Sequence, residues 1–171
     1  MQTNTQGVTY YVSTYTGRDD NDGRSPQTAF YSLRAISGTA LHAGDRILLQ
    51  RGCVFENDYL HLKNIHGRED CPITIAAYGE GELPLIETNG CGTWFQNYGC
   101  PLDHPAHRYR GYVSSSILLY DCSYIEVKDI AITNRALAID AAYNDIDAMN
   151  RTGVAVVAQN AGTLHHIYLK G

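Results

Sequence analysis

The sequence has little charge, no cluster of positive residues and no long apolar run. Lysine and arginine together number 13 against 18 aspartate and glutamate residues, which gives a net charge of −5 over 171 residues. The positive charges are scattered, whereas a nucleic-acid site gathers them on one face. The longest apolar stretches, residues 117–120 and 154–158, are far shorter than a membrane span. We therefore expect neither a nucleic-acid partner nor a membrane-spanning segment.

The sequence also lacks a secretory signal and a paired cysteine motif. Residues 1–6 contain no basic or apolar stretch of the kind that begins a signal peptide. The five cysteines are Cys53, Cys71, Cys91, Cys100 and Cys122. Their odd number and the absence of C-x-x-C spacing argue against a zinc site, so we expect no metal. Buried free thiols are the favoured interpretation, and a Cys91–Cys100 disulfide around a long loop is the alternative.

Strand signals recur along the chain, while helical periodicity is almost absent. The candidates are short, rich in β-branched or aromatic residues, and several end on Gly or Asn. The predicted strands are residues 8–13, 46–50, 59–63, 73–78, 83–87, 116–120, 124–128, 129–133, 154–158 and 166–170. The fold class is therefore predicted to be all-β.

One helix is predicted, over residues 26–36. Ser25 is a suitable N-cap residue, Pro26 suits the first helical position, and Gly38 lies just past the end. Because an open sheet edge presents unpaired backbone groups, we expect this helix to cover the first edge of the fold.

Repetition indicates how the strands are arranged. The sequence I-E-V-K at residues 125–128 returns as I-Y-L-K at residues 167–170, 42 residues later, and residues 117–120 have a similar echo at 154–157. This interval exceeds one coil of three short strands, so a loop over residues 135–152 accounts for the excess. Recurring strand units with loops at one corner are typical of a solenoid. A β-sandwich is the alternative, but the tight hairpin turns it favours are missing.

The first 90 residues resemble the opening of pectate-lyase-like proteins. The similar segments are residues 10–13 (YYVS), 17–26 (GRDDNDGRSP), 41–48 (LHAGDRIL) and 72–79 (PITIAAYG). The resemblance implies a right-handed parallel β-helix as a single domain over residues 1–171. Residues 8–40 would form an edge strand and a capping helix. Residues 41–171 would form the first coils, with loops at 88–115 and 135–152.

A narrower resemblance begins at Trp94. It is carried by residues 94–98 (WFQNY), 102–104 (LDH), 108–115 (RYRGYVSS), 143–145 (YND), 151–154 (RTGV) and 158–160 (AQN). These segments are similar to glycoside hydrolase family 136, the lacto-N-biosidases. The resemblance implies the N-terminal part of a retaining glycosidase. We expect no cofactor and a location outside the cell or at its surface. The catalytic aspartate pair would lie beyond residue 171.

Two other functions remain open. A uronic-acid lyase on the same scaffold needs a lysine or arginine base, yet Lys128 and Lys170 recur at the same place in the repeat, which favours a structural role. A non-catalytic segment that completes a partner chain is the third possibility. Because residues 165–171 end on a predicted strand with an uncovered edge, we expect another chain or a further segment to continue the coil.

The predicted loop at 88–115 is the best candidate for a substrate site. It is far longer than a corner requires and rich in aromatic residues. Flat aromatic rings stack on apolar sugar faces, and arginine donates hydrogen bonds to sugar hydroxyls. The residues predicted to contact an oligosaccharide or polysaccharide substrate are therefore Trp94, Tyr98, Arg108 and Tyr109. The alternative is that the aromatic residues only fold the loop onto the wall of the coil.

Acidic and histidine clusters are weaker candidates. Asp140, Asp145 and Asp147 could supply two carboxylates at the spacing that glycoside hydrolysis needs, although capping or turn roles are favoured. Residues 19–23 resemble the start of a calcium loop but lack its later glutamate, which favours a connection built from Asx turns. The histidine pairs at 104 and 107 and at 165 and 166 are interpreted as loop and strand-end residues.

Overall fold

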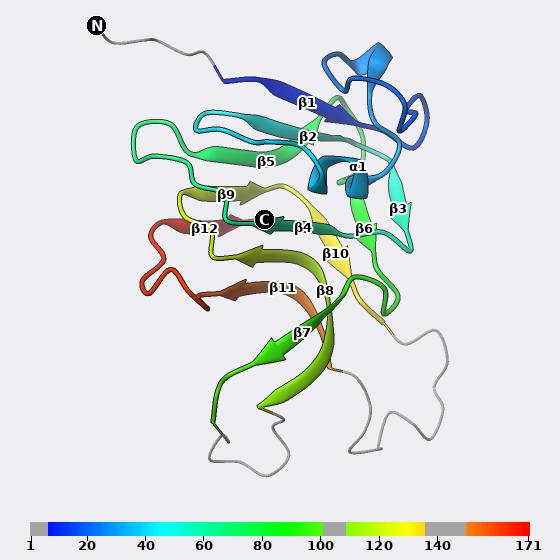
Figure 1. Ribbon diagram of the computed structural model, residues 1–171. Helices are drawn as coiled ribbons and strands as arrows, with labels where there is room; N and C mark the ends of the chain where they lie inside the picture. Colours follow the sequence, from blue (N-terminus) through cyan, green and yellow to red (C-terminus); the bar gives the residue numbers. More distant parts are fainter. Residues whose placement is uncertain (1–6, 101–108, 136–149) are drawn as a thin grey trace, which may run out of the picture.

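The structure is a computed structural model that describes residues 7–100, 109–135 and 150–171 (Figure 1). The described part is mostly β, with strands gathered in three sheets and only short helical segments. Among the described residues, no helix is long and apolar enough to cross a membrane.

The first sheet is parallel throughout and contains the first and last strands. Its order is β1 (Thr9–Val12), β2 (Arg46–Gln50), β5 (Ile73–Tyr78), β9 (Ile125–Lys128) and β12 (Ile167–Lys170). The predicted repeat is confirmed here, because Ile125 pairs with Ile167 and Lys128 pairs with Lys170.

The second and third sheets are smaller. The second contains β3 (Val54–Glu56), β6 (Leu85–Glu87) and β10 (Ala131–Thr133), all parallel. The third contains β4 (Leu60–Lys63), β8 (Arg110–Tyr120) and β11 (Arg151–Val157), also parallel, and β7 (Thr93–Asn97) is antiparallel to β8. From β2 onward the chain visits the three sheets in a fixed order, and we call each such passage a coil.

Side chains of successive coils stack in register to form the core. In the first sheet Ile47, Ile75 and Val127 lie side by side, and in the second Phe55 lies beside Ile86. These residues are buried in a common cluster that joins all three sheets. Each such side chain contributes about 1.5–3 kcal/mol when it is removed from water. Apolar residues at alternate positions of each strand therefore hold the coils together.

Backbone groups of Gly23 and Phe30, rather than a helix, pair with the free edge of β1. The Tyr11 N–H donates to the Gly23 carbonyl at 2.8 Å, the Phe30 N–H donates to the Tyr11 carbonyl at 2.9 Å, and the Ser13 N–H donates to the Phe30 carbonyl at 2.9 Å. The backbone groups of the first edge strand are thus paired within the chain, which removes a template for aggregation.

The predicted helix over residues 26–36 is wrong as a single element. Pro26–Thr28 forms a 3₁₀ turn, η1, and Leu33–Ser37 forms a short α-helix, α1. The segment between them is extended because Phe30 pairs with Val12. The predicted N-cap is confirmed for the first turn, where the Ser25 hydroxyl accepts from the Thr28 N–H at 3.2 Å.

Two aspartates hold this segment in place. Asp19 accepts from the N–H groups of Tyr31 and Ser32 at 2.9 and 2.7 Å. Asp58 accepts from the Leu33 N–H at 2.7 Å and pairs with Arg34 at 3.1 Å. Asp19 acts as a backbone clamp, which agrees with the predicted Asx-rich connection. Among the described residues, no group of three metal-ligating side chains was found.

The loop and cysteine predictions also need correction. Residues 88–115 are not one loop, because they contain β7 and the first half of β8, paired as an antiparallel hairpin. Residues 136–149 of the second predicted loop lie outside the described residues, and Arg151 already belongs to β11. All five cysteines are free, so the Cys91–Cys100 disulfide is not formed. Only Cys53 and Cys122 are buried.

A buried carboxylate joins the corner after β8 to the next coil. Asp121 accepts from the N–H groups of Gln159, Asn160 and Ala161 at 2.7, 3.0 and 3.1 Å. Burial alone would raise the pKa of Asp121, but these N–H groups outweigh it and hold the pKa below its ordinary value. The charged carboxylate therefore stabilises the loop at residues 159–161.

This clamp predicts a pH dependence. Because the folded-state pKa is lowered, its contribution is complete above the ordinary aspartate pKa of about 4 and is lost as pH falls through the lower folded value. The amide NMR signals of Asn160 and Ala161 should titrate with a midpoint below about 4. The titration should vanish in Asp121→Asn, and a midpoint at or above that value would contradict the clamp.

The close packing of the backbone around Gly17 predicts that a larger residue there lowers the stability of the fold. A Cβ at this position would lie 2.1 Å from the Phe30 carbonyl oxygen and 2.3 Å from that of Ser13. Gly17→Ala should therefore lower the free energy of unfolding by about 3 kcal/mol, measured by urea denaturation. Gly38→Ala is the matched control, because its nearest neighbour is 3.9 Å away. Equal stability of the two variants would contradict the close packing of Gly17 against the Phe30 and Ser13 carbonyls.

Candidate functional site

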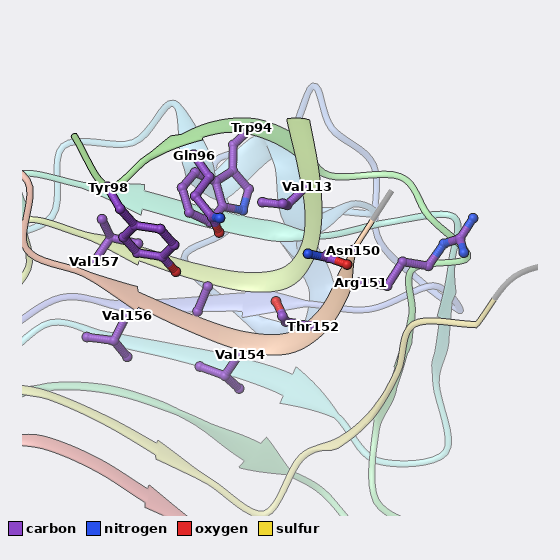
Figure 2. Close-up of a pocket in the computed structure, with 11 residues that line it drawn as sticks. Trp94, Gln96, Tyr98, Val113, Asn150, Arg151, Thr152, Val154, Val156 and Val157 are labelled. Carbon is purple, nitrogen blue, oxygen red and sulfur yellow. The ribbon is translucent and has the colours of Figure 1, made fainter. Parts of the chain in front are cut away.

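A hairpin of β7 and β8 projects beyond the coil (Figure 1). Its strands pair from Thr93 opposite Ser114 to Asn97 opposite Arg110. The remainder of β8 pairs with β4 from Ile117 onward, so β7 continues the same edge of β8 that β4 occupies. Side chains alternate between two faces of the hairpin. One face carries Trp94 and Val113 toward β11 (Figure 2).

The base of the hairpin fits tightly against the coil. Gly92 has a φ of +61°, and a Cβ there would lie 2.6 Å from the Ser115 carbonyl oxygen. The Ser115 N–H also donates to the Gly92 carbonyl at 3.1 Å. Next to it, the Ser114 hydroxyl donates to the Cys91 carbonyl. A residue with a side chain could not make this approach, so glycine fixes where the hairpin leaves the coil.

A cleft of about 580 Å³ lies between the hairpin and β11. This volume is within the range of small-ligand sites. Figure 2 shows the aromatic side chains of the hairpin above the strand β11. The lining residues are Trp94, Gln96, Tyr98, Val113, Asn150, Arg151, Thr152, Val154, Ala155, Val156 and Val157.

Hydroxyl groups beneath the cleft lock the hairpin to β11. The Trp94 indole N–H donates to the Ser115 hydroxyl at 2.8 Å, and that hydroxyl lies 2.7 Å from the Thr152 hydroxyl. Asn134 also bridges the two strands, since its amide donates to carbonyls of Ser114 and Thr152. The position of Trp94 is therefore set by a buried polar network.

A histidine on β4 joins the same network. His61 Nε2 lies 3.0 Å from the Ser115 carbonyl oxygen. Because a carbonyl can only accept, Nε2 must carry the hydrogen. Burial lowers the pKa of His61 below its ordinary value, more strongly than the Ser115 carbonyl raises it. A neutral imidazole therefore supports the wall of the cleft.

Trp94 forms a packed wall rather than a free platform. Trp94 as a whole residue is 8% exposed and belongs to a small cluster with Val113 and Leu118. It also meets Tyr120 edge-on, with ring centroids 6.3 Å apart. Tyr98, in contrast, is 55% exposed, so it is the aromatic ring in the lining that a ligand can reach most easily.

The floor of the cleft contains side chains from both faces of β11. Val154 pairs with Ile117 and Val156 with Leu119, both of which are buried in the main core. Ala155 and Val157 point the other way, toward the Trp94 cluster.

The cleft can bind a polar ligand, but its described lining contains no carboxylate. Gln96, Asn150, Arg151 and Thr152 supply amide, guanidinium and hydroxyl groups beside the aromatic rings. Glycoside hydrolysis needs two carboxyl groups flanking the scissile bond. The described lining therefore suits recognition of a hydroxyl-rich ligand and does not by itself provide the acid and base.

The predicted site residues are only partly brought together. Trp94 and Tyr98 both line the cleft, while Tyr109 is half-buried and accepts from the Tyr98 N–H through its carbonyl at 2.8 Å. Arg108 lies outside the described residues. So do the weak catalytic candidates Asp140, Asp145 and Asp147 and the histidines at 104 and 107.

The C-terminal histidine pair lies away from the cleft lining. His165 and His166 both stack against Tyr124, and His166 Nε2 lies 2.9 Å from Glu126. Glu126 also pairs with Lys128. These contacts agree with the strand-end role predicted for the pair.

Sequence reasoning missed Gln96, Arg151 and Thr152. The repeat contained a signal for Arg151 and Thr152. Extending the match of residues 117–120 with 154–157 back along both strands places Arg151 opposite Ser114 and Thr152 opposite Ser115, as the structure does. Gln96 gave no such signal, because its place depends on the hairpin.

The polar network predicts coupled losses of stability. Ser115→Ala would leave the buried Trp94 N–H without this acceptor and should lower the free energy of unfolding by about 2 kcal/mol. The same substitution in a Trp94→Phe background should cost less, because the donor is already absent. Urea denaturation of the double-mutant cycle measures this difference. Tyr31→Phe, at an exposed ring, should stay within about 0.5 kcal/mol of the parent. Additive losses would show that the two groups are not coupled.

Comparison with known proteins finds a curated relative and several similar crystal structures, while no family model matches the chain. The curated relative is a lacto-N-biosidase of Bifidobacterium longum subsp. longum, 36% identical over 98% of this chain and 12% of its own length. The chain therefore spans only a small part of that relative.

Two of the similar crystal structures are the selenomethionine and native forms of a lacto-N-biosidase of glycoside hydrolase family 136 from Eubacterium ramulus. Each has a TM-score of 0.89, with 51% and 50% identity over 96% and 95% of this chain. The match covers 26% of the crystallised chain in both. Over most of its length the chain is thus homologous to lacto-N-biosidases.

Proposed function

We propose that this chain is part of a retaining glycoside hydrolase that releases a disaccharide from oligosaccharides, as a lacto-N-biosidase. The similarity to the Eubacterium ramulus lacto-N-biosidase, 51% identical over 96% of this chain, carries the proposal. The side chains that line the cleft are compatible with this function, because aromatic rings, amides and a guanidinium group suit a ligand rich in hydroxyl groups. The segment would contribute the closed first edge of the fold and one wall of the substrate cleft.

The scaffold proposed for this activity is a right-handed parallel β-helix. In its support, the chain visits three parallel sheets in a fixed order, and equivalent strands of successive coils pair in register. Connections between parallel strands of one sheet are right-handed in nearly all proteins, which supports the hand. The antiparallel β7 is the exception to this pattern, and it lies in the hairpin outside the coil.

Further polypeptide is proposed to pair with the open edges of the last coil. Within the described residues no strand covers the outer edges of β10, β11 and β12. Val156 and Leu169 are 43% and 51% exposed, although both occupy positions that are buried in the preceding coil. An added coil, from a continuation of the chain or from a partner chain, would bury these side chains. The catalytic aspartate pair is proposed to lie in it, beyond residue 171.

The lyase alternative has less support. Lys128 forms an ion pair with Glu126, and Lys63 lies 5.7 Å over the ring of Tyr120. Both lysines therefore have structural contacts that compete with a role as a free base. Neither lines the cleft beside the hairpin.

Hydrolysis of an aryl lacto-N-bioside by the whole protein, as its source produces it, tests the proposal. We expect release of the disaccharide, and NMR of the first product should show the β-anomer, since a double displacement retains configuration. Rising ultraviolet absorbance with a polyuronate, without disaccharide release, would instead establish a lyase. Inversion at the anomeric carbon would overturn the retaining mechanism.

Two sets of variants test which residues bind the substrate and which take part in its hydrolysis. Tyr98→Ala should raise KM about tenfold and leave kcat almost unchanged, because the ring contacts substrate away from the reacting atoms. Tyr31→Ala, an equally exposed tyrosine outside the cleft, is the matched control.

Replacing Asp140, Asp145 or Asp147 by Asn should lower kcat less than about tenfold. A loss of a thousandfold or more at one of them would place a catalytic carboxylate in this chain.

A further inference from the structure

The hairpin has a second aromatic face, directed away from the cleft. Phe95 and Tyr112 are cross-strand partners on this face, and they are 44% and 69% exposed. Their ring centroids lie 5.3 Å apart at an interplanar angle of 75°, so one ring meets the edge of the other. Adjacent exposed apolar side chains with polar residues around them are a feature of binding surfaces.

Polar groups flank the two rings. The Arg110 guanidinium lies 5.7 Å over the ring of Phe95, and Asn97 is the cross-strand partner of Arg110. Both residues are exposed. Among the described residues, none of the ion pairs involves Arg110. The contact with Phe95 holds its N–H donors beside the aromatic rings.

The backbone holds these four side chains in a fixed geometry. The opposite face of the same hairpin is packed, because Trp94 and Val113 are buried against Leu118. The Trp94 indole is further tied to Ser115. The outer rings are thus presented by a strand pair that is anchored from behind. A ligand would meet groups already in place, which reduces the entropic cost of binding.

We propose that this outer aromatic face, formed by Phe95, Asn97, Arg110 and Tyr112, binds a pyranose ring of an oligosaccharide at a site separate from the cleft. The exposed face of Tyr112 stacks on the C–H groups of the sugar, since the negative face of an aromatic ring attracts them. Phe95 keeps the Tyr112 ring upright through the edge contact. Arg110 and Asn97 donate hydrogen bonds to the hydroxyl groups.

The size of the face favours a sugar over a protein partner. The paired residues of the hairpin extend about 17 Å, and its two strands lie about 5 Å apart. A stable protein interface buries about 800 Å² on each side, far more than this strip offers. One or two sugar rings match its dimensions.

Alternation along the hairpin keeps this site apart from the cleft. Trp94, Gln96 and Val113 face β11, whereas Phe95 and Tyr112 face the opposite side. One sugar ring cannot touch both faces of a strand pair. A chain with both sites could hold two segments of a branched oligosaccharide or two separate molecules.

Binding of lactose and of N,N′-diacetylchitobiose to the whole protein tests the inference by saturation-transfer NMR. All variants carry Tyr98→Ala, which removes the accessible ring of the cleft. In that background, Tyr112→Ala should raise Kd about tenfold for at least one sugar, the loss of one stacking contact. Tyr112→Phe should retain binding, because it keeps the ring. Tyr31→Ala is the matched control at an exposed tyrosine elsewhere and should leave Kd unchanged.

The other outcomes overturn the inference. Equal Kd values for the parent background and Tyr112→Ala would show that sugars do not use this face. Loss of self-association or of a protein complex in Tyr112→Ala, with sugar binding unaffected, would assign the face to a protein partner. Because the readout is binding, a failure to hydrolyse glycosides would leave this result unchanged and would count against the proposed function alone.

Discussion

In-register pairing of successive coils is the interaction on which the rest of the structure depends. It places Ile47, Ile75 and Val127 in one buried column and repeats the same arrangement in the other sheets. The arrangement also requires every coil to have a neighbour, because an uncovered strand leaves both backbone groups and apolar side chains in water. The first edge meets this requirement with the segment from Gly23 to Phe30.

The hairpin is possible because β8 is longer than its partner in the preceding coil. Only the last part of β8 pairs with β4, and β7 pairs with the rest of the same edge. Gly92 permits the close approach at the base, and the contact between Ser115 and Thr152 ties the hairpin to the following coil. A departure from the repeat thus creates two faces with different surroundings: one borders the cleft and the other meets solvent.

The described lining of the cleft has groups suited to binding a ligand but lacks the carboxylates that hydrolysis would require. The cleft offers aromatic rings, amides and a guanidinium group, while its described lining lacks the carboxylate pair of a glycosidase. Buried carboxylates elsewhere accept from backbone N–H groups, as Asp58 and Asp121 do. These acidic groups hold corners together. Homology to lacto-N-biosidases extends over a small part of their length, and the reactive groups are proposed to lie beyond this segment.

Local patterns in the sequence determined most strands and the repeat, because side-chain alternation and turn residues act over a few neighbours. They also identified Trp94 and Tyr98 as residues of one candidate site. Only the tertiary structure decided that Phe30 extends to pair with Val12, which divides the predicted helix. It likewise decided that Trp94 is a buried wall and that β7 pairs with the first half of β8. Those outcomes depend on register between distant strands, and no local preference encodes it.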